Sequence, residues 1–247
     1  MVDQQPEMMF RTEEGVLVPA VTAEEMREVD RIAVEEFGLG ILQMMENAGR
    51  NLADNVLTML DGARGEITIL AGSGGNGGGG LCCARHLHNR GFKVWVVLDG
   101  EQAKLTTAAR NQLQILRAAG VQPMDASHAH DLLRRSRVVV DALIGYGLRG
   151  TPQGKTAELI DLCNDRGRRI LSLDVPSGIN ATTGEAPGPV VRPDRTLTLA
   201  LPKTGLHSVP GDLYLGDIGI PPEVFHRLGM NLEPPFRKGH CVRLVSV

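Results

Sequence analysis

Glycine and polar residues that could bind or transform a ligand follow three apolar runs in this sequence of 247 residues. A glycine-rich run occupies residues 72–80, Asp141 closes a second apolar run, and Asp174 and Ser177 follow a third. Because ligands of open parallel sheets bind beyond the carboxyl ends of the strands, these residues are candidates for a single site.

The glycine-rich run matches the dinucleotide-binding pattern G-x-G-x-x-G from Gly72, and Asp99 lies about twenty residues further on, where a ribose-binding acid would stand. Each glycine over residues 77–80 disfavours a helix by about 1 kcal/mol. The next helix is therefore predicted to begin at Leu81, after a long loop. The backbone of this loop, at the N-terminus of that helix, is predicted to bind an anion.

The segments after the other two runs place further polar groups at the same predicted sheet edge. Asp141 leads into a glycine-punctuated turn that contains Arg149, a side chain suited to phosphate. Pro176 rigidifies the turn that carries Asp174 and Ser177. The sequence around Ser177 reads P-S-G rather than the nucleophile pattern G-x-S-x-G, which disfavours a serine hydrolase.

Three of these side chains form a candidate cation site. Asn76, Asp141 and Ser177 can supply an amide oxygen, a carboxylate and a hydroxyl from three strand ends. Hard oxygen ligands with a single negative charge suit a weakly held cation better than a dedicated divalent site, which normally collects more carboxylates.

Composition excludes several classes of partner. The net charge is −3 and aromatic residues make up 3%, which disfavours a nucleic-acid binder. The longest apolar runs are far shorter than the roughly 18–20 residues of a membrane span, and the first 15 residues do not resemble a signal peptide. We therefore expect a cytoplasmic protein without membrane contact. The four cysteines show no metal-ligand or disulfide spacing and are expected to be reduced: Cys82, Cys83, Cys163 and Cys241.

Helical and extended patterns alternate along the chain. Thr22 and Glu25 form a capping-box pattern, and helices are predicted from there to about residue 37 and over 41–60. Apolar strands separated by helical stretches are predicted at 67–71, 93–99, 137–141, 169–174, 196–201 and 213–220. This alternation is typical of βαβ units with a mostly parallel sheet.

The predicted organisation is one α/β domain over residues 19–247, preceded by a flexible arm over the polar residues 1–18. Two helices are expected before any strand. No repeat or linker divides the remainder of the chain. The fold class is predicted as a Rossmann-like three-layer sandwich, with helices on both faces of the sheet.

Six motifs in order make residues 22–226 resemble the NAD(P)H-hydrate epimerases, which interconvert the R and S forms of hydrated nicotinamide nucleotides. The motifs are MENAGR at 45–50, the glycine run with ARHL at 84–87, VDALIG at 140–145, LDVPSG at 173–178, LPKTGL at 201–206 and DIGIP at 217–221. The order of all six over most of the chain is far more specific than any one motif.

The resemblance implies a Rossmann-like fold, a homodimer and one potassium ion per subunit, with hydrated NADH or NADPH as substrate. It implies potassium ligands at Asn76, Asp141 and Ser177, and Asp174 as the candidate catalytic acid–base group. The implied substrate-binding residues are Gly75, Asn76, Gly77, Gly78, Gly79, Gly145, Tyr146, Gly147, Leu148, Arg149, Gly150, Thr151 and Asp174. The two N-terminal helices are the expected dimer surface. Relatives that also carry a dehydratase domain are longer than this chain.

Two positions depart from the family's usual loop, G-x-G-N-N-G-G-D-G. Gly75 replaces the first asparagine and Gly79 replaces the aspartate, so two polar side chains are missing. A catalytically weak relative that binds a nucleotide or a protein through the same pocket is therefore the alternative to an active epimerase. A third interpretation, an NAD-dependent oxidoreductase, rests on the glycine pattern and Asp99, but the sequence offers no catalytic Tyr/Lys pair for it.

Overall fold

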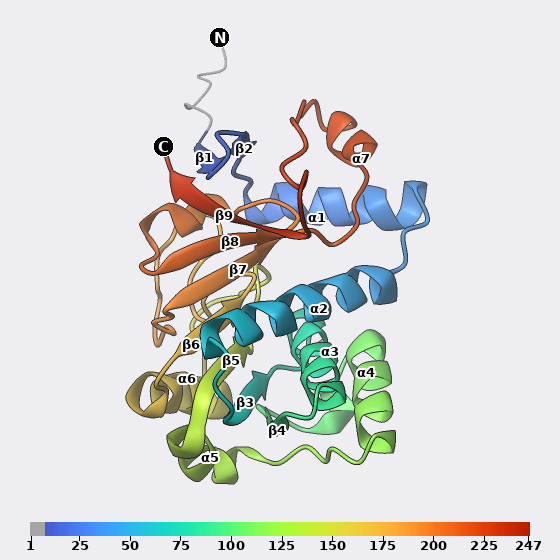
Figure 1. Ribbon diagram of the computed structural model, residues 1–247. Helices are drawn as coiled ribbons and strands as arrows, with labels where there is room; N and C mark the ends of the chain where they lie inside the picture. The colour runs from blue at the N-terminus through green and yellow to red at the C-terminus, as the bar shows by residue number, and fades with distance from the viewer. Residues whose placement is uncertain (1–7) are drawn as a thin grey trace.

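A computed structural model describes residues 8–247 of the chain as a nine-stranded sheet with helices on both faces (Figure 1). The strand order is β2-β1-β9-β8-β7-β6-β5-β3-β4. The strands are β1 (Met9–Thr12), β2 (Leu17–Pro19), β3 (Glu66–Ala71), β4 (Lys93–Leu98), β5 (Ser136–Ala142), β6 (Ile170–Leu173), β7 (Arg195–Leu199), β8 (Asp212–Gly216) and β9 (Cys241–Ser246). The six strands from β4 to β8 in this order are parallel, and β9, β1 and β2 add antiparallel pairs at one edge.

Two helical layers cover the parallel strands. The α-helices are α1 (Ala23–Arg31), α2 (Ile41–Leu60), α3 (Gly75–Asn89), α4 (Thr107–Ala118), α5 (Ala129–Arg135), α6 (Gly154–Arg166) and α7 (Pro222–His226). Ile67 and Ile69 of β3 pack with α2, α3 and α4, while Leu70 points to the other face and packs with α5 and α6. This alternation follows the two-residue period of a strand. The predicted three-layer α/β fold is confirmed, and no helix within residues 8–247 is long and apolar enough to cross a membrane.

The N-terminal segment corrects the sequence-based prediction. Residues 1–7 of the predicted arm lie outside the described residues, but residues 9–12 and 17–19 form two strands of the sheet: β1 pairs with β2 and with β9. Phe10 is 1% exposed and packs into an apolar cluster with residues of α1 and β8. The expectations of a flexible arm over residues 8–18 and of two helices before any strand are therefore wrong, because β9 supplies a partner from the far end of the chain.

The helices α1 and α2 form where they were predicted. Thr22 caps α1: its side chain accepts a hydrogen bond from the Glu25 backbone N–H, and Glu25 reaches back to the Thr22 backbone. A short π-helical turn, Ile32–Glu36, extends α1. Helix α2 ends at Leu60 and is capped by Asp61, whose φ of 49° is left-handed. These two helices place Asp30 and Met45 beside the carboxyl ends of the central strands.

Helix α3 begins at Gly75 rather than at Leu81, and some of its early glycines lie where a side chain would not fit. A Cβ on Gly77 would lie 1.8 Å from the carbonyl oxygen of Gly72. A Cβ on Gly80 would lie 2.7 Å from the Cβ of Ala142 on β5. Close packing on the sheet therefore outweighs the low helix propensity that the prediction relied on. The loop between β3 and α3 is correspondingly short.

Candidate active site

A cavity of about 760 Å³ lies beyond the carboxyl ends of β3, β5 and β6, where the sequence predicted a site. Helices α1 and α2 contribute to its wall. The predicted binding residues that line the cavity are Gly75, Asn76, Gly79, Gly145, Tyr146, Gly147, Leu148, Arg149, Thr151 and Asp174. Gly77 and Gly78 instead pack inward, against the β3–α3 turn and Met45 respectively. Gly150 has a left-handed φ of 72° in the turn beside the cavity.

Asp141 and Ser177 meet directly behind the cavity wall. Both are 0% exposed, and the Ser177 hydroxyl donates to Asp141 Oδ1 at 2.5 Å. Asp141 also accepts hydrogen bonds from the Ser177 backbone N–H at 2.9 Å, the Ser172 hydroxyl at 2.7 Å and the Leu143 N–H at 3.3 Å. All four donors are neutral. Burial raises the pKa of the Asp141 carboxyl, although the hydrogen bonds from Ser177 and Ser172 lower it.

Asn76 projects from the first turn of α3 toward the same region. A Cβ on Gly145 would lie 3.2 Å from Asn76 Oδ1 and 3.0 Å from Asp174 Oδ2, so both side chains crowd the glycine turn after β5. The amide nitrogen of Asn76 is buried and has no hydrogen-bond partner within the described residues. Burying an amide nitrogen without a hydrogen-bond partner costs free energy unless a ligand supplies the missing contact. The amide can also be turned over, so that its oxygen takes the position of its nitrogen.

This donor set fits a monovalent cation. The buried Asp141 carboxylate has only neutral hydrogen-bond donors around it, so a positive charge nearby would offset the cost of its burial. Asn76, with its unpaired amide, can turn an oxygen toward such an ion. The Ser177 hydroxyl and the carbonyl of Ile144, 3.2 Å apart, add further oxygen atoms.

Asp174 is held in an unusual backbone conformation at the end of β6. Its φ of 68° is left-handed, which costs a non-glycine residue of order 1–3 kcal/mol and clusters at functional sites. Asp174 Oδ2 accepts the backbone N–H of Tyr146 at 2.8 Å, and Asp174 Oδ1 lies 2.5 Å from Lys203 Nζ. The carboxylate is thus fixed at both oxygens and only 4% exposed on the cavity wall.

Lys203 is a site residue that the sequence analysis did not assign, although it lies in the LPKTGL motif. It is 1% exposed, and its ammonium group contacts Asp174, the carbonyl of Leu199 at 2.9 Å and the hydroxyl of Thr198 at 3.4 Å. The ammonium nitrogen also lies 5.7 Å from the centre of the Tyr146 ring. Lysine is rarely buried unless it is paired with an opposite charge, and here Asp174 supplies that charge.

Asp30 is a second site residue that the sequence analysis missed. It lines the cavity from α1, and the Tyr146 hydroxyl donates to its Oδ2 at 2.5 Å. Burial raises the pKa of the Asp30 carboxyl, while the Tyr146 hydrogen bond lowers it. No motif marks Asp30, because it lies on an amphipathic helix far from the strand ends in sequence. Its place follows only from how α1 docks on the sheet.

The two glycines that depart from the family pattern both lie in the first turns of α3. A Cβ on Gly75 would meet nothing within 4 Å, so the cavity is open at this point. A Cβ on Gly79 would lie 2.8 Å from a terminal methyl carbon of Leu173, at the flexible end of that side chain. Both positions have helical backbone, so larger residues need no left-handed conformation there.

Asp99, the acid that the glycine pattern pairs with a ribose, also reaches the cavity. It accepts a hydrogen bond from the Thr156 hydroxyl at 2.8 Å. Burial raises the pKa of the Asp99 carboxyl. The cavity therefore extends from the Asp30–Tyr146 pair to Asp99 after β4 and Thr156 on α6, with polar groups at both ends.

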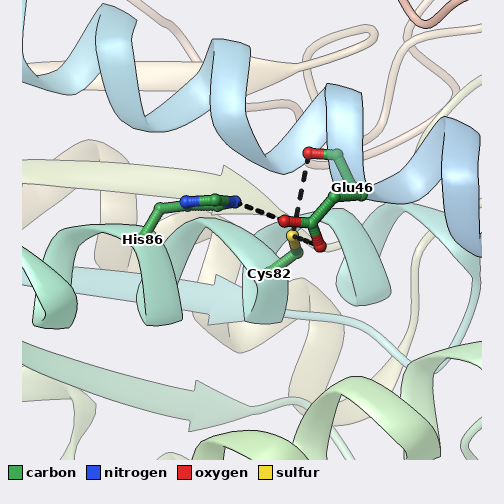
Figure 2. A group of neighbouring side chains, drawn as sticks. All are labelled: Glu46, Cys82 and His86. Atoms are coloured by element: carbon green, nitrogen blue, oxygen red, sulfur yellow. Dashed lines mark hydrogen bonds and ion pairs between the residues drawn. The ribbon is translucent and has the colours of Figure 1, made fainter.

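A separate cluster joins α2 to α3 at Glu46, Cys82 and His86 (Figure 2). The Glu46 carboxylate contacts His86 Nε2 at 2.9 Å and Cys82 Sγ at 3.3 Å, and Arg85 already supplies a positive charge 2.5 Å from Glu46. Burial and the Glu46 charge raise the pKa of the Cys82 thiol to about 12, so it is protonated at neutral pH. We interpret the cluster as an ion-pair and hydrogen-bond network that connects α2 to α3.

Comparison with known proteins gives a consistent family. The family model described as YjeF-related protein N-terminus matches residues 41–205. A protein of Dehalogenimonas lykanthroporepellens named NAD(P)H-hydrate epimerase is 48% identical over 243 residues, covering 97% of this chain and 98% of its own. A protein of the same name from Truepera radiovictrix is 36% identical and is covered over 100% of its length.

Longer relatives and a solved structure extend this comparison. A Moorella thermoacetica protein named bifunctional NAD(P)H-hydrate repair enzyme Nnr is 38% identical over 81% of this chain, which spans 40% of that protein. The crystal structure of the yeast protein ynu0 superposes with a TM-score of 0.81 at 21% identity, covering 92% of this chain and 99% of the yeast chain. The structural likeness supports the fold.

Proposed function

Because the chain belongs to the family described as YjeF-related protein N-terminus, and within it to the NAD(P)H-hydrate epimerases, we propose that it interconverts the R and S forms of hydrated NADH and NADPH. The enzyme is an isomerase of nicotinamide nucleotide repair. The observation that carries this conclusion is the 48% identity to a named epimerase over 97% of the chain. The cavity at the strand ends, with its ion-paired Asp174, supplies a matching site.

The cavity suits a dinucleotide. Helix α3, 15 residues long, begins at its wall, and the free backbone N–H groups of a helix N-terminus favour an anion such as a pyrophosphate. Gly75 leaves open space beside that turn, so the phosphates could approach the backbone closely. Arg149 lines the same cavity and offers a planar guanidinium for a second phosphate contact.

Asp174 is the proposed acid–base residue. The reaction needs a group that exchanges a proton with the hydroxyl on the hydrated ring carbon as this hydroxyl leaves and returns. Lys203 and the Tyr146 backbone N–H hold the Asp174 carboxylate at the cavity wall, which fixes its orientation toward a bound ring. Lys203, which also lines the cavity, therefore acts as a positioning residue through its ion pair with Asp174.

We propose potassium as the resident cation, held by Asn76, Asp141 and Ser177. Its positive charge would offset the buried Asp141 carboxylate and tie together the ends of β3, β5 and β6. The side chains of Asn76 and Asp174 both lie against the turn at Gly145. An ion held by Asn76 would therefore help to fix the turn against which the substrate lies.

A homodimer in the cytoplasm is the proposed state of the enzyme. Large apolar side chains are exposed around the start of α2, among them Ile41 at 54%, Leu42 at 43% and Phe37 at 38%. Such a group of exposed apolar side chains is suited to burial against a second copy.

The direct test of the proposed function is an epimerase assay. Purified S-NADPH hydrate and R-NADPH hydrate are each incubated with the protein, and the approach to the equilibrium mixture is followed by chromatography. We expect both mixtures to converge faster with protein than with buffer alone. Binding of NADPH hydrate, measured by thermal stabilisation, without faster convergence would instead favour the alternative, a relative that binds through the same pocket.

Potassium dependence provides a second prediction. Potassium chloride is expected to raise the melting temperature above that in tetramethylammonium chloride of equal ionic strength, because a ligand that binds only the folded state stabilises it. The Asn76→Ala variant should lose this difference. It should otherwise be almost as stable as the natural chain, since the buried amide nitrogen of Asn76 has no partner to lose. An equal potassium response in both proteins would contradict the assignment.

The two family departures lead to a third prediction. A missing charged hydrogen bond is worth about 1.5–3 kcal/mol, or roughly ten- to a hundred-fold in rate. Restoring both side chains in a Gly75→Asn/Gly79→Asp variant is therefore expected to raise epimerase turnover at least several-fold. Open space at Gly75 and the flexible end of Leu173 beside Gly79 allow both substitutions. An unchanged rate in a variant with an unchanged melting temperature would show that these side chains do not limit turnover.

A further inference from the structure

Tyr146 connects two carboxyl groups of the cavity. Its backbone N–H donates to Asp174 Oδ2 at 2.8 Å, and its hydroxyl donates to Asp30 Oδ2 at 2.5 Å. All three residues line the same cavity. The two carboxyl groups are therefore held apart by the length of one tyrosine, from its backbone nitrogen to its hydroxyl. Both carboxyl groups face the same cavity, where one ligand could contact each of them.

The two carboxyl groups have different surroundings. Asp174 lies 2.5 Å from the ammonium group of Lys203, whereas the nearest partner of Asp30 is the neutral Tyr146 hydroxyl. Burial raises the pKa of Asp30, and the nearby Asp174 charge raises it further, against lowering by Tyr146 and Lys203. Paired carboxyl groups whose environments differ in this way are typical of an acid and a base that act together.

We propose that Asp30 is a second acid–base residue of the epimerase, which shares one proton with Asp174 across the substrate. This inference rests on the proposed function and deepens it. Inverting glycosidases also use two carboxyl groups, one as acid and one as base, to exchange a substituent on one carbon with inversion. Epimerisation at a hydroxyl-bearing carbon likewise exchanges the hydroxyl and inverts the carbon.

The proton and electron balance closes without any further reactant. The Asp30 carboxylic acid gives its proton to the departing hydroxyl, the C–O bond breaks to release water, and the ring-nitrogen lone pair forms a C=N bond. Water then adds to the other face of that carbon, a new C–O bond forms, and the C=N electrons return to nitrogen. The proton released by this water passes to Asp174. The reverse reaction begins from that protonation state, and proton exchange with solvent restores the first.

The decisive variant is Asp30→Asn, which keeps an oxygen that can accept the Tyr146 hydrogen bond but cannot exchange a proton. We expect turnover to fall by about 10²–10⁴-fold, the usual contribution of a general acid or base. Thermal stabilisation by NADPH should stay within twofold of the natural chain in its apparent dissociation constant. Glu28→Gln, on the same helix but paired with Arg31 at the surface, is the matched control and should keep full turnover.

The pH profile separates an acid–base role from a structural one. The groups facing Asp30 are Tyr146 after β5, Asp174 after β6 and Lys203 before the 3₁₀-helix η4 (Thr204–Ser208). Arg27 on α1 lies over the Tyr146 ring, 6.0 Å from its centre. Because turnover requires one shared proton, it should fall as the pH rises through the Asp30 pKa. The Tyr146 hydrogen bond lowers that pKa, so Tyr146→Phe should shift this alkaline limb to higher pH.

Each outcome decides between the two proposals. If the natural chain does not speed the equilibration of the hydrates, the proposed function fails. If the natural chain is active and Asp30→Asn keeps its turnover, only the role of Asp30 is overturned. If Asp30→Asn is poorly folded, the Tyr146→Phe profile decides: an alkaline limb at an unchanged pH overturns the proposal, and a shifted limb supports it.

Discussion

Replacing Asp174 with asparagine is expected to lower epimerase turnover by about 10²–10⁴-fold, because the variant loses a proton-exchanging group on the cavity wall. Asparagine is chosen because it tolerates the left-handed φ of 68° better than most residues. The substitution also leaves the buried Lys203 ammonium without its counter-charge, so some loss of stability is expected.

Turnover of Asp174→Asn should therefore be measured well below its melting temperature, with the folded fraction checked by circular dichroism. Asp165→Asn, an exposed aspartate on α6 paired with Arg166, serves as the matched control and should be indistinguishable from the natural chain. A well-folded Asp174→Asn variant with natural turnover would contradict the acid–base role proposed for Asp174.

Removing the partner charge is expected to have the largest effect on stability. Lys203→Met keeps a long side chain but leaves the Asp174 carboxylate, 4% exposed, without an ammonium partner. Breaking a buried ion pair from one side typically costs 3–5 kcal/mol. We expect a decrease of about that size in the free energy of unfolding, measured by urea denaturation.

The double variant Lys203→Met/Asp174→Asn provides the test of this cause. It should recover part of the lost stability, because no unpaired charge remains in the wall of the cavity. Lys155→Met, at an exposed position near the start of α6, is the control and should change the free energy of unfolding by less than about 0.5 kcal/mol. A Lys203→Met variant as stable as this control would show that the ion pair does not stabilise the fold.

The sequence located those site residues that lie at the ends of strands. Asp141, Asp174 and Ser177 each follow a buried apolar run, and parallel strands bring such positions to one edge of the sheet. The direct contact between Ser177 and Asp141 agrees with that placement. Their roles as cation ligands and as an acid–base group remain predictions.

The part that sequence reasoning missed comes from segments whose position depends on tertiary packing. Asp30 reaches the cavity only because α1 docks across the strand ends, and helical periodicity does not say which face of a sheet a helix covers. Lys203 is buried although lysine is almost always exposed, so residue type alone argues against it. Only its partner, Asp174, explains its place.

The glycines within residues 75–80 led to a prediction that placed the start of α3 too late. Helix propensity placed the start of α3 at Leu81, but the structure starts the helix at Gly75. Propensity counts the conformational cost of glycine and ignores what a side chain would strike. At Gly77 the backbone of Gly72, just after β3, occupies that space, and at Gly80 the Cβ of Ala142 on β5 does. Glycine is therefore the residue that lets the helix approach the sheet.

The antiparallel edge of the sheet has a consequence for synthesis of the protein on the ribosome. Strands β1 and β2 join the sheet through β9, and β9 lies more than 220 residues later in the chain. During synthesis, β1 and β2 therefore have only each other as sheet partners until residues 241–246 have emerged. During this interval Phe10 is not yet buried as it is in the complete sheet. A nascent chain halted before β9 should thus expose its N-terminal strands to proteases and chaperones, even where the parallel strands have already assembled.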